Sequence, residues 1–356
     1  MKRITAVAVL LAVILSVLVP FGGAFAEERK PPRGFLEEES EPSFRVDMLG
    51  STEETPPGNL RLLTGDPGEN YSFRSMTREG FPEDYQPDMT GLSVLNISGS
   101  SQYSVGQFRF LAKKIAELAP DVKNVYIVDL RQESHGFAYD DNESDYFGIP
   151  MSWHASHNWA NLGMSTEEVL AAEKKHFQEL VGTSVTLKGK ARKNGDRHNK
   201  VIQVTSVMTE EDLVNTVNAE IPDIEFHYIR FAIPDRTFPE EEIIDAFIQF
   251  VKGIDMDSSW LHFHCLAGMG RTAIMMSVYD MMKNPEVPMM DILARQTMTG
   301  GSYPLNPGFG GDEAMKEYDE KRLLQVPLVY EYIQENRASN YETPWSEWLV
   351  ATQSAD

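Results

Sequence analysis

The residues best suited to chemistry form one short run, His264-Cys265-Leu266-Ala267-Gly268-Met269-Gly270-Arg271-Thr272. An apolar strand is expected before this run and a helix after it, and two glycines lie between the cysteine and the arginine. Such a loop can turn successive backbone N–H groups toward one point, and the N-terminus of the following helix adds its positive dipole there. The run therefore predicts an oxyanion cradle with a thiol at its floor.

Cys265 is the only cysteine of the chain, so it cannot form an intramolecular disulfide. By count alone, a single thiol is more often an inert buried residue than a nucleophile. The loop changes that balance, because inward N–H groups, a helix dipole and the Arg271 guanidinium all favour the thiolate. Such surroundings lower a cysteine pKa from about 8.5 to roughly 3.5–7.5.

The neighbours of Cys265 suit phosphoryl chemistry. Arg271 can clamp two phosphoryl oxygens at once. The Thr272 hydroxyl could donate to the sulfur and ease its later departure, whereas His264 is expected to hold the loop rather than to attack. We therefore expect Cys265 to act as a nucleophile.

The elements that would position this loop alternate between strands and helices along the chain. The expected strands are Ser93–Ser98, Asn124–Leu130, Tyr228–Ile233 and Ser259–His264. The expected helices are Ser104–Leu118, Glu167–Leu180, Glu240–Ile254, Arg271–Met282 and Leu323–Arg337. This alternation predicts an α/β fold whose mostly parallel sheet is flanked by helices. A turn signal at Lys193-Asn194-Gly195-Asp196, between two alternating stretches, indicates a smaller β-rich insertion.

Composition limits the classes of partner and cofactor. The chain has 356 residues, with 54 acidic against 32 basic side chains and a net charge of −22, which argues against nucleic acid as the main partner. A local cationic pocket stays possible. A lone cysteine excludes a zinc cluster built on cysteines, and we find neither a His-x-x-x-His helix nor a P-loop lysine after the glycines. We expect catalysis without a metal or a cofactor.

The first 26 residues have the layout of a secretory signal peptide. Lys2 and Arg3 precede a nearly continuous apolar run over residues 4–19, and Ala24-Phe25-Ala26 supplies small residues for a peptidase. Removal of residues 1–26 takes away two positive charges and no acid, which leaves a net charge of −24. The mature protein is expected in the periplasm or outside the cell.

A membrane anchor is the alternative for this segment. Pro20 and the pair Gly22-Gly23 interrupt the apolar stretch, and no later stretch approaches the roughly 20 apolar residues that span a bilayer. We therefore expect no membrane association after cleavage. Residues 27–60 are rich in Pro, Glu and Gly and are expected to form an extended arm with little regular structure.

The C-x5-R spacing resembles that of the cysteine-dependent phosphatases. Further runs resemble the bacterial protein-tyrosine-phosphatase-like phytases, which are inositol polyphosphate phosphohydrolases: Val128–Gly136 (VDLRQESHG), Asn158–Gly163 (NWANLG), Trp260–Cys265 (WLHFHC) and Thr343–Ser346 (TPWS). The resemblance extends from about residue 70 to the C-terminal end.

This resemblance implies a cysteine-phosphatase-type core over residues 61–356. A smaller partial β-barrel would be inserted at about residues 137–208. It also implies a secreted phytase that hydrolyses myo-inositol hexakisphosphate stepwise, through a phosphocysteine intermediate.

The family also implies a general-acid loop, matched here by Pro234-Asp235-Arg236-Thr237-Phe238-Pro239. Asp235 would protonate the leaving oxygen and later take a proton from water. Without the resemblance, an Asp beside Pro could equally cap a helix or start a turn. Arg236 and Leu266 depart from the Asp-His and the post-cysteine Glu that members often carry. Both departures suit polyanion binding and leave open the order in which phosphates are removed.

Other substrate contacts are expected from the loop backbone and from basic side chains. These residues are Leu266, Ala267, Gly268, Met269, Gly270, Arg236, Arg74, Arg192, Lys193 and Lys316, with Lys321 and Arg322 as further candidates for the rim. Arg74 matches a family position that binds a substrate phosphate. The alternative for the basic cluster around Arg192 and Lys193 is a solvated hairpin face.

Two further sets of residues allow more than one interpretation. Asn158 stands where relatives can have Asp. Arg131, Glu133 and His135 follow a strand end, where α/β sites collect, or they form a buried network that orients the loop. We favour the supporting network.

Two other functions share these motifs. A protein tyrosine or dual-specificity phosphatase would use the same chemistry in a different pocket, and a phosphate-binding effector module would bind without turnover. The intact Cys265, Arg271 and Asp235 argue against the silent module. The oligomeric state, monomer or homodimer, stays open.

Overall fold

The computed structural model describes residues 43–46, 53–64, 81–82, 84–142, 148–187, 200–221, 223–306 and 315–354. The expected signal peptide, Arg74, Arg192 and Lys193 lie outside these residues. The chain divides into Met1–Glu38 and Glu39–Asp356, and every described element belongs to the second unit. Within the described part of the chain, no helix combines the length and apolar character that a bilayer crossing requires.

Five strands form the central sheet, in the order β10-β4-β11-β3-β2. Their bounds are β2 Arg61–Leu63, β3 Ile97–Ser100, β4 Asn124–Arg131, β10 Glu225–Ile233 and β11 Ser259–His264. The first four strands in that order run parallel, and only β2 is antiparallel to its neighbour. All residues of β11 are buried, as expected for a central strand covered on both faces. This arrangement confirms the predicted α/β class.

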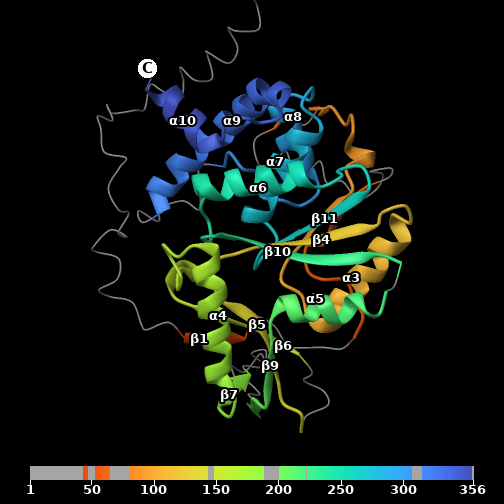
Figure 1. The fold of residues 1–356 in the computed structure, drawn as a ribbon, viewed down its shortest axis with the longest axis vertical. Coiled ribbons are helices and arrows are strands. Elements are labelled where there is room, and N and C mark those ends of the chain that lie inside the picture. Colours follow the sequence, from red (N-terminus) through yellow and green to blue (C-terminus); the bar gives the residue numbers. More distant parts are fainter. Residues whose placement is uncertain are drawn as a thin grey trace, which may run out of the picture. The chain divides into compact units, whose positions relative to one another are not determined.

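Helices cover the two faces of this sheet (Figure 1). One face carries α6 Glu241–Gly253, α7 Gly270–Lys283, α8 Met289–Met298, α9 Lys316–Asn336 and α10 Trp345–Gln353. The other face carries α3 Val105–Leu118 and α5 Glu210–Asn218. Helix α6 shows why the layers hold together. Its buried side chains Ile244, Phe247, Ile248 and Val251 recur at helical spacing, and each such burial contributes about 1.5–3 kcal/mol.

A second sheet is antiparallel, with the order β1-β6-β5-β9, and a separate hairpin pairs β7 with β8. The bounds are β1 Ser43–Val46, β5 His135–Tyr139, β6 Ile149–His154, β7 Ser184–Leu187, β8 Lys200–Gln203 and β9 Ser206–Met208. Helix α4, Thr166–Leu180, packs on β5 and on β9. The described strands of this β-rich part do not close into a barrel. Strand β1 lies within the segment for which little regular structure was expected.

Short 3-10 turns complete the described elements: Leu92–Val94, Ser156–Asn158 and Arg337–Ser339. The first of these corrects the strand predicted at 93–98. That strand is β3 and begins only at Ile97, because Asn96 has a left-handed φ of 52° that separates the turn from the strand.

The predicted last helix is also longer than its sequence suggested. Helix α9 begins at Lys316 and contains Pro327, and α10 follows it as a further helix. Proline removes one backbone donor but has a φ compatible with a helix, so flanking contacts can carry the helix through it. Here Lys321 pairs with Glu240 at 2.8 Å and ties the first turns of α9 to the start of α6.

Candidate active site

Cys265 lies directly after the carboxyl end of β11 and is 3% exposed. The backbone N–H of Gly268 donates to its Sγ atom at 3.2 Å. Gly268 has a φ of +70°, and a Cβ atom there would lie 2.3 Å from the carbonyl carbon of Ser100. Only glycine satisfies both constraints, so the loop that carries the thiol depends on this position.

The carbonyl groups of the loop are held outward. Gln102 N–H donates to Leu266 O at 3.1 Å, and the Asn59 amide donates to Ala267 O at 2.8 Å. The carbonyl of Met269 accepts from Ala273 N–H at 3.1 Å, which begins α7. With these carbonyls bound from outside, the loop N–H groups can turn to the interior, as an anion requires, and the Gly268 N–H already points at the sulfur.

Arg271 is buried at the start of α7 and is held by Glu133. Its Nη1 donates to Glu133 Oε2 at 2.8 Å and its Nη2 to Glu133 Oε1 at 3.0 Å. Nη1 also donates to the carbonyl of Ile233 at 3.0 Å. The Nε atom is buried and has no hydrogen-bond partner among the described residues. Glu133 therefore does not use the edge formed by Nε and Nη2, which two oxygens of one anion could bind.

Asp235 faces the same edge of that guanidinium. Its Oδ1 lies 3.2 Å from Arg271 Nη2 and accepts from the Arg236 N–H at 3.1 Å. Its Oδ2 accepts from the Asn158 amide at 2.5 Å, and Trp159 Nε1 donates to its backbone carbonyl at 2.9 Å. The Asp235 side chain is 23% exposed, so it can exchange protons with a bound group. The loop expected to supply an acid thus lies beside the thiol loop.

Glu133 belongs to a buried polar network behind the two loops. Arg131 Nε donates to Glu133 Oε1 at 2.9 Å, and Arg131 Nη1 donates to Gln102 Oε1 at 2.7 Å. Burial alone would raise the pKa of Glu133, but the guanidinium groups of Arg271 and Arg131 outweigh burial and hold it well below its usual value. Arg131 and Glu133 therefore support Arg271 from behind.

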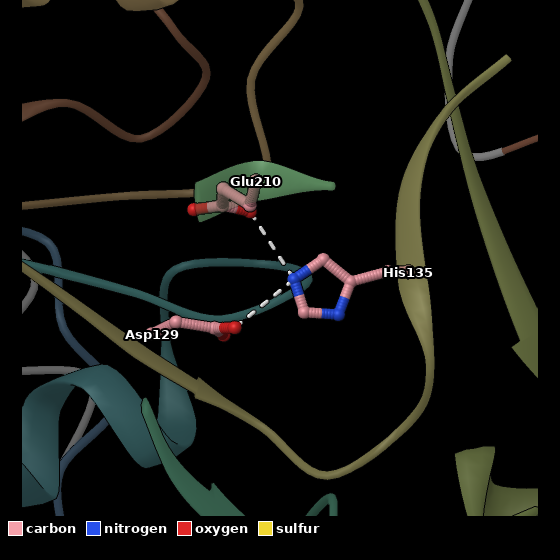
Figure 2. A group of neighbouring side chains, drawn as sticks. All are labelled: Asp129, His135 and Glu210. Carbon is pink, nitrogen blue, oxygen red and sulfur yellow. Dashed lines mark hydrogen bonds and ion pairs between the residues drawn. The ribbon is translucent and has the colours of Figure 1, made fainter. Parts of the chain in front are cut away.

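His135 lies between two carboxylates in the same network (Figure 2). Its Nε2 is 3.2 Å from Asp129 Oδ2 and 3.1 Å from Glu210 Oε2. Burial disfavours the charged ring, but the Asp129 carboxylate outweighs burial and raises the pKa of His135 to about 9. His135 is therefore a cation at neutral pH.

The geometry of these three residues could also hold a metal ion. Their remaining oxygens already have donors, however. Asp129 Oδ1 accepts from the Arg131 backbone N–H at 2.9 Å, and Glu210 Oε1 accepts from Tyr103 Oη. Hydrogen bonds thus explain the cluster without a further ligand.

The charges of the network balance. Its buried carboxylates are Asp129, Glu133, Glu173 and Glu210, and its buried guanidinium groups are Arg131, Arg230 and Arg271. Protonated His135 supplies the fourth positive charge. This balance is what permits so many ionised groups away from water.

His264 and Thr272 are both buried next to the thiol loop. His264 Nε2 lies 2.6 Å from Glu210 Oε1, which ties the end of β11 to α5. The hydroxyl of Thr272 has no hydrogen-bond partner among the described residues. His264 thus holds the strand end, and Thr272 keeps a free donor beside the loop.

The predicted substrate contacts at the rim of the site do not form one cluster. Arg236 is exposed, with a left-handed φ of 66°, and Met269 is 41% exposed at the loop. Lys316 is exposed at the start of α9, two residues before Tyr318, whose ring lies 5.0 Å from that of Trp159. That contact places the beginning of α9 beside the Asp235 loop.

Two rim candidates instead have acidic partners. Lys321 lies 2.8 Å from Glu240, and Arg322 lies 2.9 Å from Asp319. Ion pairs within the fold thus hold both side chains.

Sequence reasoning missed several residues of this site. Glu210 follows Thr209 in a capping sequence typical of a solvated helix start, yet its carboxylate is buried. Asp129 lies in a mostly apolar stretch that the sequence predicts as a buried strand, without a sign of its role. Arg61 lies in the short edge strand β2, and Asn59 lies just before it. Nothing in the sequence around them indicates that this segment lies near the thiol loop.

Comparisons with known proteins agree with this geometry. The model of the PTP-like phytase family, described as inositol hexakisphosphate, matches residues 128–283. A solved PTP-like myo-inositol phosphatase from Mitsuokella multacida, in complex with myo-inositol-(1,3,4,5)-tetrakisphosphate, is 30% identical. The match covers 88% of this chain and 50% of that one, with a TM-score of 0.71.

Two other relatives extend the comparison. A PTP-like phytase from Bdellovibrio bacteriovorus is 24% identical over 92% of this chain and 98% of its own, with a TM-score of 0.62, and shares the fold. The effector protein hopD2 of Pseudomonas syringae pv. tomato is 28% identical over 228 residues, which is 62% of this chain and 45% of hopD2. The chain spans about half the length of the Mitsuokella and Pseudomonas proteins.

Replacing Gly268 tests the loop geometry. We expect Gly268→Ala to lower the free energy of unfolding by at least about 2 kcal/mol, because alanine is strained at this φ and its Cβ meets the Ser100 backbone. Gly270→Ala is the matched control, since a Cβ at Gly270 meets nothing within 4 Å. Urea denaturation measures both, and equal stabilities for the two variants would contradict the argument.

The charge of His135 predicts a pH dependence of stability. Because its folded pKa of about 9 exceeds the usual 6.5, the stabilisation is complete below about pH 6.5 and is lost as the pH rises through 9. The loss amounts to about 3 kcal/mol. Denaturation at several pH values should show this decline in the wild type and a flatter profile in His135→Gln. The same decline in both proteins would refute the assignment.

Proposed function

Since the chain belongs to the protein-tyrosine-phosphatase-like phytase family, we propose that it is a cysteine-dependent phosphatase of inositol polyphosphates, with myo-inositol hexakisphosphate as its substrate. The observation that carries the proposal is the convergence of three groups. The Gly268 N–H of the loop donates to the sulfur of Cys265, and Asp235 Oδ1 lies 3.2 Å from Nη2 of Arg271 at the end of the same loop. The inositol phosphate bound by the Mitsuokella relative supports this choice of substrate.

The first step would transfer a phosphoryl group to sulfur. The Cys265 thiolate attacks phosphorus, the bond from phosphorus to the inositol oxygen breaks, and Asp235 gives its proton to the departing oxygen. The loop N–H groups hold the equatorial oxygens while charge develops on them. The products are a phosphocysteine and a lower inositol phosphate.

The second step would return the enzyme to its starting state. Asp235, now a carboxylate, takes a proton from water as that water attacks the phosphocysteine. The S–P bond breaks, inorganic phosphate leaves, and the thiolate is restored. The Thr272 hydroxyl has no other partner among the described residues, which suits it to stabilise the departing sulfur by a hydrogen bond. Repetition on the product gives stepwise hydrolysis.

Arg271 would change partners during this cycle. Glu133 holds one end of the guanidinium, whereas the edge of Nε and Nη2 faces Asp235 and the loop interior. An incoming phosphate takes that edge with two oxygens, which withdraws a cation from Asp235 and adds an anion near it. The Asp235 side chain is thereby released from Arg271 and can turn to the leaving oxygen of the substrate.

Replacement of the two reacting residues tests this function. We expect Cys265→Ser to abolish phosphate release from inositol hexakisphosphate. Asp235→Asn should lower kcat by about 10²–10⁴, with a smaller loss on p-nitrophenyl phosphate, whose leaving group needs no proton. Asp257→Asn is the matched control, because that side chain is 94% exposed and pairs with Lys283 away from the loop. Full activity of Cys265→Ser would refute the proposal.

A phosphorylated protein is the second candidate substrate, because Cys265, Arg271 and Asp235 could act on a phosphotyrosine in the same way. Both substrates would use the same nucleophile and acid. Comparing kcat/KM on tyrosine-phosphorylated peptides with kcat/KM on inositol hexakisphosphate separates the two. A preference for the peptides would replace the proposed substrate class and leave the chemistry intact.

We also propose that the protein is exported, on the strength of Lys2, Arg3 and the apolar run that follows them. Expression of the full chain in a bacterial host should release a protein outside the cytoplasm whose intact mass corresponds to a start at Glu27. A full-length mass in the cytoplasmic fraction would contradict export.

A further inference from the structure

Trp159 lies in the connection between β6 and α4, residues 155–163, which we call the tryptophan segment. Its indole Nε1 donates to the backbone carbonyl of Asp235 at 2.9 Å, and the neighbouring Asn158 amide donates to the Asp235 side chain. The indole has one donor and no acceptor, so this contact is a hydrogen bond from the tryptophan to the acid loop. Two adjacent residues of one segment thus hold the main chain and the side chain of the same aspartate.

The acid loop is anchored on both sides of Asp235. Before it, the carbonyl of Ile233 accepts from Arg271 Nη1, and after it Phe238 is buried in the core. Among the residues that the structure describes, Trp159 Nε1 is the one donor to the Asp235 carbonyl. The main chain at Asp235 is therefore held between these two anchors by a side chain from a different segment.

The carbonyl of Asp235 has a different part in the reaction from its carboxyl group. In the proposed cycle the carboxyl group gives up and regains a proton, and its contact with Arg271 is exchanged for substrate. The carbonyl neither titrates nor takes part in either step, so its bond from the indole can persist throughout. That bond fixes the main chain from which the reacting carboxyl group extends.

The orientation of Trp159 is fixed by its own neighbours. The centre of its ring lies 4.9 Å from that of His157 and 5.0 Å from that of Tyr318 at the start of α9. His157 and Asn158 have left-handed φ values of 55° and 63°. Such values are uncommon outside glycine and persist where the surroundings hold them. The tryptophan segment thus presents the indole to the acid loop in a defined direction.

The tryptophan segment is also tied to the support of Arg271. The Asn161 amide donates to the carbonyl of Gln132 and to the hydroxyl of Ser134, each at 3.0 Å. These two residues flank Glu133, whose carboxylate binds Arg271. The segment that holds the acid loop is therefore anchored on the residues that hold the guanidinium.

We propose that Trp159 is a positioning residue for the general acid, because its indole N–H fixes the Asp235 carbonyl and thereby places the carboxyl group against the leaving oxygen. The inference rests on the proposed function in one respect, that Asp235 is the acid. Proton transfer needs the two heavy atoms within about 2.6–3.2 Å of each other. A small displacement of the loop therefore slows the chemical step and leaves substrate binding unchanged.

Trp159→Phe tests this role, because phenylalanine keeps an aromatic ring beside Tyr318 and has no donor. We expect kcat/KM on inositol hexakisphosphate to fall about 10–100-fold. On p-nitrophenyl phosphate, whose leaving group needs no proton, kcat/KM should stay within about twofold of the wild type. Since kcat/KM reports the steps up to the phosphocysteine, the two substrates differ only in the need for the acid. Trp159→Leu replaces Trp159→Phe if the latter does not fold.

A double variant separates positioning of the acid from a general structural effect. In Asp235→Asn the acid is already lost, so adding Trp159→Phe should change kcat/KM on inositol hexakisphosphate by less than about twofold. Binding gives a further measurement. In a Cys265→Ser background, Trp159→Phe should leave the Kd of inositol hexakisphosphate, measured by calorimetry, unchanged.

Trp348→Phe is the matched control. The indole Nε1 of Trp348 also donates one hydrogen bond, to Glu335 at 2.8 Å, in a contact between α10 and α9. This variant loses the same kind of bond away from the acid loop. Its kcat/KM on both substrates should match the wild type.

Three results would overturn the inference. A folded Trp159→Phe or Trp159→Leu protein with wild-type kcat/KM on inositol hexakisphosphate would show that the indole bond has no effect on the acid. Equal losses on both substrates, or a further loss in the Asp235→Asn background, would make the role structural. A raised Kd in the Cys265→Ser background would make Trp159 a substrate contact.

These results leave the proposed function intact as long as the wild type releases phosphate from inositol hexakisphosphate. A wild type that releases none would overturn the proposed function instead. Tyrosine-phosphorylated peptides, whose leaving oxygen also needs a proton, then replace inositol hexakisphosphate in the same comparison of Trp159→Phe with the wild type.

Discussion

The bidentate ion pair between Arg271 and Glu133 is the constraint on which the rest of the site depends. It fixes the guanidinium plane at the carboxyl ends of the parallel strands. The end formed by Nη1 and Nη2 is bound to Glu133, and the edge formed by Nε and Nη2 faces the interior of the site. Removing either partner would leave a buried charge uncompensated, which typically destabilises a protein by about 3–5 kcal/mol. The thiol loop ends at Arg271, and Asp235 of the acid loop lies 3.2 Å from the same guanidinium, so both loops depend on its orientation.

That ion pair survives burial because the surrounding network is neutral and comes from many elements. Glu173 lies on α4, yet it accepts from the His135 backbone at 2.7 Å and from Arg230 Nη1 at 2.6 Å. Glu210 lies on α5 and contacts His264 beside the thiol. The β-rich insertion and the core sheet therefore share one set of charges. A substitution in the insertion would therefore affect the thiol loop through these side-chain contacts as well as through the backbone.

The sequence predicted the parts of the site that one continuous segment specifies. The strand, the glycine loop and the helix around Cys265 follow from local spacing, and the α/β class follows from the alternation of elements. Asp235 needed the family resemblance, because an Asp beside Pro is common in turns. Glu210 and Asn59 could not be predicted, because each contacts a segment that is distant in the chain. Asn96 broke the predicted strand through a backbone conformation that its neighbours do not signal.

The same ion pairs imply a competition within the catalytic cycle. Without substrate, Arg271 Nη2, the Asn158 amide and the Arg236 N–H all contact the carboxyl group of Asp235. A phosphate dianion removes the first of these donors and leaves the other two in place. Asn158 thus keeps Asp235 oriented when Arg271 turns to the phosphate, because its amide donates a hydrogen bond to the Asp235 side chain. A carboxylate at position 158 could not donate that hydrogen bond to an ionised Asp235. The amide at position 158 therefore keeps one contact of the acid loop in place while the contact with Arg271 is exchanged for substrate.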